Sequence, residues 1–424
     1  MSGRCVHELR MIVVAALIIG VGACGGGGGS TSKDGRRGAS ATKIVIWEQM
    51  DPKEVTRFDR HLNAYMAAHP EVRVEHSHFN TEDLRSQFQN AANAGGGPDL
   101  VYGPSDQVGP FSVLKIILPL DTLIPASTLA NFHPAAFDTL DGHIWAIPDQ
   151  IGNHLVLVYN KDLVPTAPAD FNALIDAARK LTVDDDGDGT PDRYGLAFET
   201  NEPFWLIPFL TASGGWVMDA TGQPTLGTPA MVDALRFLAD LKNKVGIVPK
   251  ECNYQLMDTL FKEKKTPFII NGPWSWQDYI DSGINLGLAP IPPLEPGGRR
   301  PAPMAAAKGY SINANVPAER KAAVLALLEY LTSPEVVADF PDLLILPSRR
   351  EILDSPKVTG NPLLVASRQA YEAGRRMPVT PQMRAIWDAM RPVQQSVMNG
   401  SLRPEAAAAQ MQKDAVSKIA AMMN

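Results

Sequence analysis

Strand-like and helix-like stretches alternate along residues 43–102, and this alternation constrains the fold more than any other feature of the chain. KIVIW (43–47) and PDLVY (98–102) are short apolar runs typical of buried strands, and EVRVEHSHF between them alternates like a strand. The intervening stretches have helical spacing and end at a His-Pro and a Gly-Gly-Gly break. Strands separated by helices of this length predict an α/β fold with a mostly parallel sheet.

The chain is long enough for two lobes, because 424 residues exceed what one hydrophobic core usually organises. HIWAIPDQIGNHLVLVYNKDL (143–163) contains two strand-like runs with a kink at Pro148 and Gly152, where the chain can leave one sheet and enter another. The second half is rich in predicted helices, over DFNALIDAARKL, after Thr228-Pro229, over 317–332, from Ser333-Pro334 onward and over the tail PEAAAAQMQKDAVSKIAAMM.

Residues 1–23 have the features of a bacterial secretory signal. Arg4 and Arg10 give a basic start, and the apolar stretch that follows is too short to span a bilayer. Small residues stand directly before Cys24, which resembles the lipobox of bacterial lipoproteins; the alternative is a chance cysteine after a signal peptide. Residues 24–42, rich in Gly and Ser, are expected to form a flexible tether. The mature chain is therefore expected outside the cytoplasm, in the cell envelope, anchored to the membrane by lipid on Cys24.

The composition is that of an ordinary acidic globular protein. The net charge of −7, the pI near 5.7 and the lack of a basic stripe argue against nucleic acid as a partner and disfavour anionic ligands. Of the three cysteines, only Cys252 would remain as a free thiol in the mature chain, so no intramolecular disulfide is expected. Cys252 is interpreted as a packed small hydrophobe.

Two tryptophans follow a chain break in PFIINGPWSW (267–276). Because Pro273 cannot donate to a strand ladder, Trp274 and Trp276 are expected on a turn or on the first turn of a helix. A pyranose ring has one face of C–H bonds and a rim of hydroxyls, so its receptor needs flat apolar platforms surrounded by polar groups. These two tryptophans and Trp387 are candidate platforms, with Trp276 more suited to packing behind Trp274; the alternative for each is a place in the core.

Several carboxylates fall at predicted strand ends or in turns: Glu48, Asp51, Asp106, Asp149 and Glu202. In α/β sheets ligands bind at the carboxyl ends of strands, and an ionised carboxylate accepts strong hydrogen bonds from sugar hydroxyls. Helix caps and turns are the alternative roles. Two carboxylates facing one bond would also suit glycoside hydrolysis, and nothing in the spacing distinguishes the two uses.

One acidic loop, DDDGDGTPD (184–192), is similar to a truncated calcium loop. Its carboxylates at Asp184, Asp186, Asp188 and Asp192 alternate around glycines, but the glutamate of the twelfth position is missing. A structural calcium site and a solvated acidic turn are both open. No other cofactor is predicted, because the sequence has no P-loop, no Rossmann glycine fingerprint and no G-x-S-x-G motif.

From KIVIW to the C-terminus the chain resembles the maltose/maltodextrin-binding proteins of ABC importers, within the larger set of extracellular solute-binding proteins. The matching stretches are KIVIW, GPDLVYGPSD, LVLVYNKDLVP, NEPFWLIP, INGPWSW, INLGLAPIP and MPVTPQMRAIWDAMRPV. INGPWSW and the last stretch are the most specific of these. The resemblance implies that Trp274 and Trp387 stack on sugar, that Phe204 adds an aromatic contact, and that Glu202 and Asp106 bond sugar hydroxyls.

Three positions depart from this family pattern. Gly103 stands where maltose binders carry an aromatic residue, Gln107 replaces a cation, and Asn153 replaces a glutamate. The loss of one platform and two charged contacts leaves open a di- or oligosaccharide other than maltose. The candidate ligand-binding residues are therefore Trp274, Trp387, Glu202, Asp106, Phe204, Glu48, Asp51, Asn153, Trp276 and Gln107.

The resemblance also implies two α/β lobes that close on a sugar by hinge bending. The lobes are expected to comprise 43–149 with 289–314 and 150–288 with 315–424, with crossings near 148–152, 288–292 and 310–316. Such a protein would be a monomeric, non-catalytic receptor that delivers sugar to the permease subunits of an ABC importer. The alternatives are a secreted carbohydrate-active enzyme and a binding protein for another solute, such as a polyol or a glycerophosphodiester.

Overall fold

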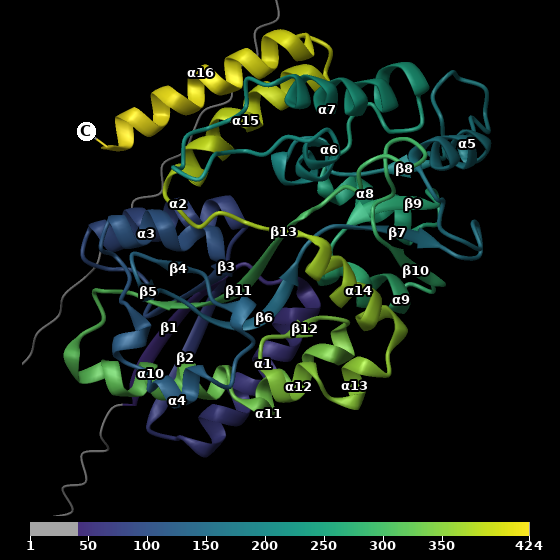
Figure 1. Ribbon diagram of the computed structural model, residues 1–424. Helices are drawn as coiled ribbons and strands as arrows, with labels where there is room; N and C mark the ends of the chain where they lie inside the picture. Colours follow the sequence, from purple (N-terminus) through teal and green to yellow (C-terminus); the bar gives the residue numbers. More distant parts are fainter. Residues whose placement is uncertain (1–40, 424) are drawn as a thin grey trace, which may run out of the picture. The chain divides into compact units, whose positions relative to one another are not determined.

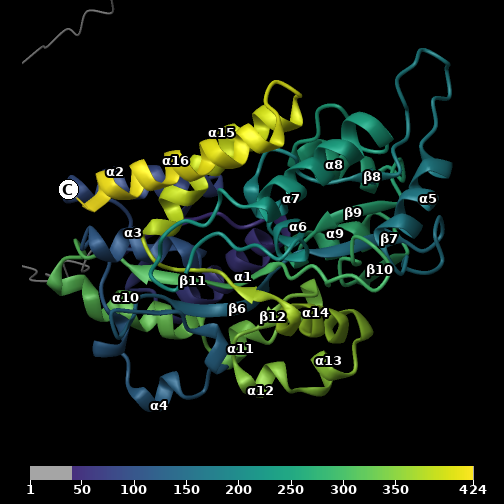
Figure 2. The ribbon, with the colours of Figure 1, turned by 45° about the horizontal axis from the view of Figure 1, so that its top comes forward.

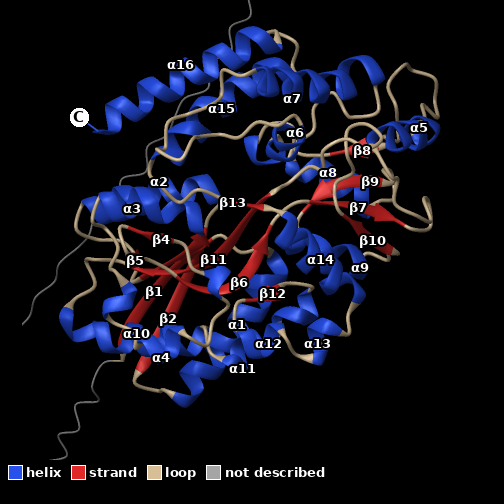
Figure 3. Cartoon of the chain, viewed as in Figure 1, coloured by secondary structure: helices blue, strands red, loops and turns tan. Residues whose placement is uncertain are grey.

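The computed structural model describes residues 41–423, so the predicted signal segment, Cys24 and nearly all of the predicted tether lie outside it. The described chain contains two separate sheets and a two-stranded ribbon among many helices (Figures 1 and 3). The predicted α/β class is confirmed. Among the described helices, none combines the length and the apolar character needed to cross a membrane.

The first sheet has seven strands in the order β12-β6-β11-β3-β1-β2, with β13 paired to β11. Their bounds are Thr42–Glu48 (β1), Val72–His78 (β2), Leu100–Pro104 (β3), Ile147–Asn153 (β6), Met304–Ile312 (β11), Leu346–Pro347 (β12) and Arg375–Arg376 (β13). β1 is parallel to β2 and β3, whereas β11 is antiparallel to β3 and β6. β13 is parallel to β11 and β12 is antiparallel to β6, so this sheet is mixed, with its continuous parallel part over β1 to β3.

Helices cover both faces of the first sheet. On one face lie α1 (Pro52–Ala68) and α10 (Ala318–Leu331), and on the other lie α2 (Thr81–Asn93) and α3 (Val108–Val113). The ribbon of β4 (Thr139–Leu140) and β5 (His143–Ile144) stands beside them. The short helices α4 (Ala126–Leu129), α11 (Pro334–Val337), α12 (Arg350–Leu353) and α13 (Pro356–Thr359) lie in the connections.

The position of α10 corrects the predicted division of the chain. Its apolar stripe, with Val324 and Leu328, packs into the same core as β1 and α1, and β12 further along pairs with β6. Residues 318–331 and 346–347 therefore belong with the first sheet, although 315–424 had been assigned to the second lobe. The crossing predicted near 310–316 is wrong for the same reason, because the chain stays with the first sheet there.

The second sheet has four strands in the order β10-β7-β9-β8. They are Val156–Asn160 (β7), Leu196–Ala197 (β8), Phe268–Asn271 (β9) and Leu286–Ala289 (β10). One core beside it draws on α5 (Phe171–Leu181), α6 (Ile207–Ala212), α7 (Pro229–Asp240), α15 (Gln382–Met398) and α16 (Pro404–Met423), and the last two run side by side (Figures 1 and 2). The other core joins the two sheets: it draws on α8 (Tyr254–Lys262), α9 (Trp276–Asp281) and α14 (Pro362–Ala373), and on strand residues of the first sheet such as Ile151 and Leu346.

Local signals explain several of these elements. Thr228 caps α7, where its hydroxyl oxygen accepts a hydrogen bond from the N–H of Met231 at 3.3 Å, and Pro229 occupies the first helical position. Cys252 is buried as predicted, and burial raises the pKa of its thiol to about 12. The tail predicted to be helical forms α16.

The chain passes between the two sheets at three places. His154 and Leu155 connect β6 to β7, the segment after β10 leads back to β11, and the segment after β13 leads to α15. The first crossing confirms that 143–163 contains two strands in different sheets. Pro148 and Gly152 both lie inside β6, so the break falls just beyond the predicted kink.

Candidate functional site

A cavity of about 760 Å³ lies where loops of the first sheet face segments of the second. From the first sheet, the loops that follow β1, β2 and β3 contribute Gln49–Pro52, His78–Glu82 and Asp106 to its wall. The second side contributes Glu199, Glu202, Phe204, Trp205, Tyr254, Gln255, Trp274, Met377, Trp387 and Arg391, and Lys308 and Asn153 come from β11 and β6. The site is therefore at the carboxyl ends of β1, β2 and β3, where a ligand of an α/β sheet is expected. Its size is that of a small-molecule site.

Trp274 lies in the wall of this cavity because the chain turns sharply after β9. Gly272 and Pro273 end the strand, and the indole folds back over Gly272, where a Cβ atom would come within 2.1 Å of the ring. The indole N–H donates to the Tyr254 hydroxyl at 2.9 Å, which fixes the ring. The Lys308 ammonium lies 5.7 Å from the ring centroid, within range of a cation–π interaction. Trp274 remains half-buried, so part of it faces the cavity.

Trp387 and Phe204 also line the cavity, but Trp276 does not. Trp387 is only 5% exposed, and its indole N–H donates to Asp106 Oδ2 at 3.1 Å. Phe204 is half-buried. Trp276 is fully buried in the core formed by α8, α9 and α14. Trp276 therefore does not line the cavity, and it belongs to a different core from the one against which Trp274 packs.

Three of the predicted carboxylates line the cavity, and each has a defined partner. Asp106 is buried and accepts a hydrogen bond from Arg85 Nη2 at 2.6 Å through its other oxygen, Oδ1. Glu202 is half-buried, and its Oε1 lies 2.8 Å from Arg391 Nε. Asp51 caps α1 in a capping box in which its N–H donates to Glu54 Oε2 at 3.1 Å. Burial, with the negative charge of Glu54 beside it, raises the pKa of Asp51.

Glu48 was expected among the ligand-binding residues, but it does not line the cavity. Its carboxylate is fully buried and lies 3.2 Å from the Nδ1 atoms of His76 and His78, while the Met50 N–H donates to it at 2.7 Å. Burial alone would raise the pKa of Glu48, but the hydrogen bonds from His76, Met50 and His78 lower it below its usual value. Glu48 thus supports the loop after β1 from beneath.

Gln107, like Trp276 and Glu48, does not line this cavity, whereas Asn153 does. Gln107 is 2% exposed, does not line this cavity, and its amide lies over Gly103, where a Cβ atom would come within 2.6 Å of Oε1. The amide therefore fills the space that a side chain at position 103 would need. Asn153, at the end of β6, lines the cavity.

The sequence reasoning missed several lining residues, among them Arg391, Lys308 and Tyr254. A signal was available for two of them. Arg391 follows Trp387 by four residues in α15, so the two share a helix face. Lys308 interrupts the apolar strand MAAAKGYSI, and a buried lysine needs a partner, here Glu54 Oε2 at 3.4 Å. Tyr254 had no such signal.

Asp149 was also expected at a strand end. It lies inside β6 and does not line the cavity. It is fully buried in β6, accepts a hydrogen bond from the Tyr102 hydroxyl at 3.1 Å, and has no partner for Oδ2. Burial raises the pKa of Asp149 to about 7, against a smaller opposing effect of the Arg57 charge. Between about pH 4 and pH 7, Asp149 is therefore protonated in the folded protein and ionised in the unfolded chain.

This proton predicts a pH-dependent effect of Asp149→Asn. Because the pKa of Asp149 is raised on folding, its contribution makes the folded state less stable as pH rises from about 4 to about 7. We expect the variant to exceed the wild type in free energy of unfolding by about 4 kcal/mol near pH 8 and nearly to match it near pH 4. Urea unfolding at both pH values measures this. A difference that is the same at both pH values would contradict the prediction.

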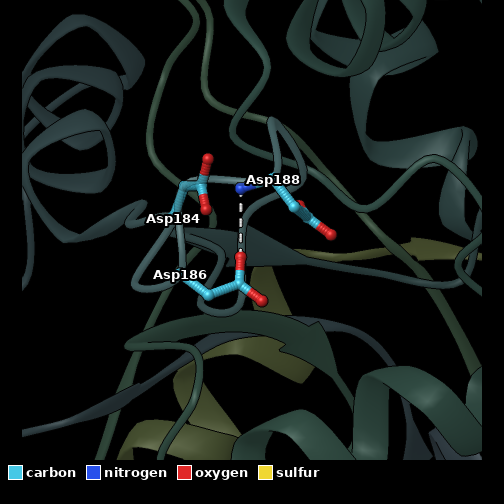
Figure 4. A group of neighbouring side chains, drawn as sticks. All are labelled: Asp184, Asp186 and Asp188. Atoms are coloured by element: carbon cyan, nitrogen blue, oxygen red, sulfur yellow. Dashed lines mark hydrogen bonds between the residues drawn. The ribbon is translucent and has the colours of Figure 1, made fainter.

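The acidic loop lies apart from the cavity and brings three carboxylates together (Figure 4). One carboxylate oxygen each of Asp184, Asp186 and Asp188 lies within 4.8 Å of the others, and all three side chains are exposed. Asp186 Oδ1 accepts a hydrogen bond from the Asp188 N–H at 3.1 Å. Asp192 instead accepts from the Asp185 N–H at 2.8 Å. The donor set is hard oxygen, which suits calcium.

Comparisons with known proteins identify relatives of the whole described chain. A family model described as bacterial extracellular solute-binding protein matches residues 61–366. The maltotriose-binding protein of Pyrococcus abyssi is 29% identical over 81% of this chain and 75% of its own length. The galactooligosaccharide-binding protein of Bacillus subtilis is 22% identical over 97% and 96%. The structure of the maltose/maltodextrin-binding domain MalE from Bdellovibrio bacteriovorus, bound to maltotriose, is 42% identical and superposes with a TM-score of 0.87, covering 89% of this chain and all of that one.

Proposed function

Because this chain belongs to the bacterial extracellular solute-binding protein family, we propose that it captures a maltooligosaccharide or a related di- or oligosaccharide for an ABC importer. The observation that carries the proposal is that Trp274 and Trp387, far apart in the sequence, line one cavity together with Asp51, Asp106 and Glu202. Aromatic faces with carboxylates around them are the chemistry that a sugar ring requires. The relatives are named as binding proteins, which supports a receptor without catalytic activity.

In this proposal Trp274 provides the main platform. Its ring is held by Tyr254 and Gly272 and is partly open to the cavity, whereas Trp387 is almost covered and offers only an edge or a small part of its face. Glu202 and Asp51 are half-buried and can accept hydrogen bonds from hydroxyls. Asp106 already binds Arg85 and Trp387, so we assign it mainly to holding the wall in place.

We further propose that the two sides close on the ligand by hinge bending at the three crossings. Direct contacts already join the two sides, such as the ion pair between Lys53 in α1 and Asp281 in α9 at 2.6 Å. A ligand that contacts both sides binds the closed state better and shifts the population toward it. The predicted lipid on Cys24, the cell-envelope location, the monomeric state and delivery to permease subunits complete this proposal.

Titration of the purified protein with maltotriose tests the proposed function. We expect a saturable change in tryptophan fluorescence and recovery of unchanged maltotriose by chromatography. A parallel panel of galactooligosaccharide, a polyol and a glycerophosphodiester identifies the preferred class of ligand. Release of shorter sugars would favour a carbohydrate-active enzyme, and a response only to the polyol or the phosphodiester would favour another solute.

For the acidic loop we propose a structural calcium site at Asp184, Asp186 and Asp188. Calcium at about one hundred times its dissociation constant should stabilise the protein by about 2.7 kcal/mol. Thermal unfolding in calcium and in excess chelator measures the effect, with magnesium as the comparison ion. Asp186→Asn should abolish the calcium-dependent rise in Tm. If the variant keeps the whole shift, the ion binds elsewhere and this proposal fails.

A further inference from the structure

A second cavity of about 530 Å³ lies directly beside the first. Its wall is made by α2, the turn after β3, α3, α15 and α16, from residues that include Gln89, Gln107, Pro110, Phe111, Pro381, Arg384, Asp388, Lys418 and Met422. Arg85 and Asp106 line both cavities. The two spaces are therefore neighbours with a common wall.

The common wall contains the buried pair of Arg85 and Asp106 and, beside it, further side chains of both cavities that are held together by charge. Glu82 lines the first cavity and Arg384 the second, and their side chains form an ion pair. Arg391 of the first cavity likewise contacts Asp388 of the second, at 3.6 Å. Arg384 and Asp388 pair with each other at 3.0 Å, and Arg391 also reaches Glu82 at 3.1 Å. We call these four residues the charged bridge.

The four side chains of the charged bridge can separate without any change in the backbone. Each of its four side chains keeps between 21% and 36% of its surface exposed, so solvent screens the pairs. The charged bridge joins α2, which packs on the first sheet, to α15, which packs in the core beside the second sheet that also contains α5, α6, α7 and α16. A ligand long enough to reach past Glu82 would have to displace it.

The second cavity has the chemistry of a site for a neutral, hydroxyl-rich ligand. Gln107 lines this cavity with its amide packed over Gly103, and its Oε1 makes no hydrogen bond to residues 41–423, so it can accept from a ligand hydroxyl once the amide turns toward the cavity. Pro110, Phe111 and Met422 supply apolar surface. The charges of Arg85 and Arg384 are already matched by Asp106 and Asp388. An ionic ligand would have to displace one of these pairs or, if anionic, pair with Lys418, which also lines the cavity.

We propose that the charged bridge is the end wall of the sugar site and sets the length of oligosaccharide that binds. This inference rests on the proposed function. In the wild type, units beyond the wall must break the bridge before they reach the second cavity, so their contacts are offset by lost ion pairs. Without Arg384 those units would extend along Gln107 and the apolar surface beside it.

Dissociation constants for the series from maltose to maltoheptaose, measured by calorimetry on wild type and Arg384→Ala, test the proposal. For the wild type, affinity should stop rising at one chain length. For Arg384→Ala, affinity should keep rising beyond that length, and the ratio of long-chain to short-chain affinity should exceed that of the wild type about tenfold, the change expected for one or two added hydrogen bonds. Arg384→Lys, which keeps a cation facing Glu82, should restore most of the wild-type limit.

Arg236→Ala is the matched control, because Arg236 makes exposed ion pairs with Asp233 and Glu405 and lines neither cavity. It should leave the length profile unchanged. If wild type binds neither these glucans nor the galactooligosaccharide of the panel above, the proposed function fails. If wild type binds glucans but Arg384→Ala shows the same length profile, with an unchanged Tm without ligand, the function stands and the bridge is not the end wall. A wild type whose affinity keeps rising through maltoheptaose would also overturn the inference.

Discussion

Asp106→Ala should lower the free energy of unfolding by about 3 kcal/mol, toward the lower end of the range for breaking a buried ion pair. Both members of the pair are nearly covered, with 4% of the Asp106 and 10% of the Arg85 side chain exposed. The substitution leaves the guanidinium in the wall with only Glu82, at 3.2 Å, and removes the acceptor of the Trp387 indole N–H. Urea unfolding of wild type and variant without ligand measures the loss.

Two further variants separate charge from packing at Asp106. Asp106→Asn keeps an oxygen for one of the two donors and should cost less than Asp106→Ala. The double variant Arg85→Met with Asp106→Leu removes both charges, so it should cost less than the sum of the two single changes. An unfolding curve of Asp106→Ala that overlays that of the wild type would show that the pair does not hold the wall.

Trp274→Ala should weaken sugar binding by about 2 to 4 kcal/mol, which is about thirty- to a thousand-fold in Kd. The reason is that the half-buried indole presents a flat apolar surface to the cavity and is fixed by Tyr254 on one side and Gly272 on the other. Calorimetric titration with maltotriose measures the loss. Trp274→Phe keeps a flat face but loses the hydrogen bond to Tyr254, so it should weaken binding much less.

Trp276→Phe is the control for Trp274, because Trp276 lies two residues away and is fully buried in the core. It should reduce stability and leave sugar affinity within about threefold of the wild type, as expected for a residue without ligand contact. Equal losses of affinity in Trp274→Ala and Trp276→Phe would mean that the loop, rather than the exposed indole face, determines binding.

The local structure could be predicted because its signals are local. β1 follows from a β-branched run, α7 from the Thr228 cap and Pro229, and the turn after β9 from the Gly-Pro break. The place of α10 could not be predicted in the same way. Its apolar stripe fits the face of either sheet, and the choice depends on contacts with β1 and α1, more than two hundred residues away in sequence.

The position of a site residue could be predicted where the residues next to it in sequence fix its side chain. It could not be predicted where pairing with a neighbouring strand fixes the side chain. Trp274 is placed by the break directly before it. Glu48 ends a strand as predicted, but the register of β1 with β2 sets His76 opposite Ile46 and His78 opposite Glu48, and these two histidines hold the carboxylate away from the cavity. Register between strands is a long-range property that a single sequence does not specify.

In the proposed function, the part of the Trp274 indole that the chain leaves uncovered is the surface that a sugar ring covers. A crystal structure of the protein with maltotriose tests this. We expect the sugar to lie in the 760 Å³ cavity, with one pyranose ring against Trp274 and hydroxyls within hydrogen-bond distance of Glu202 or Asp51. Maltotriose bound at another surface, with the cavity filled only by water, would contradict it.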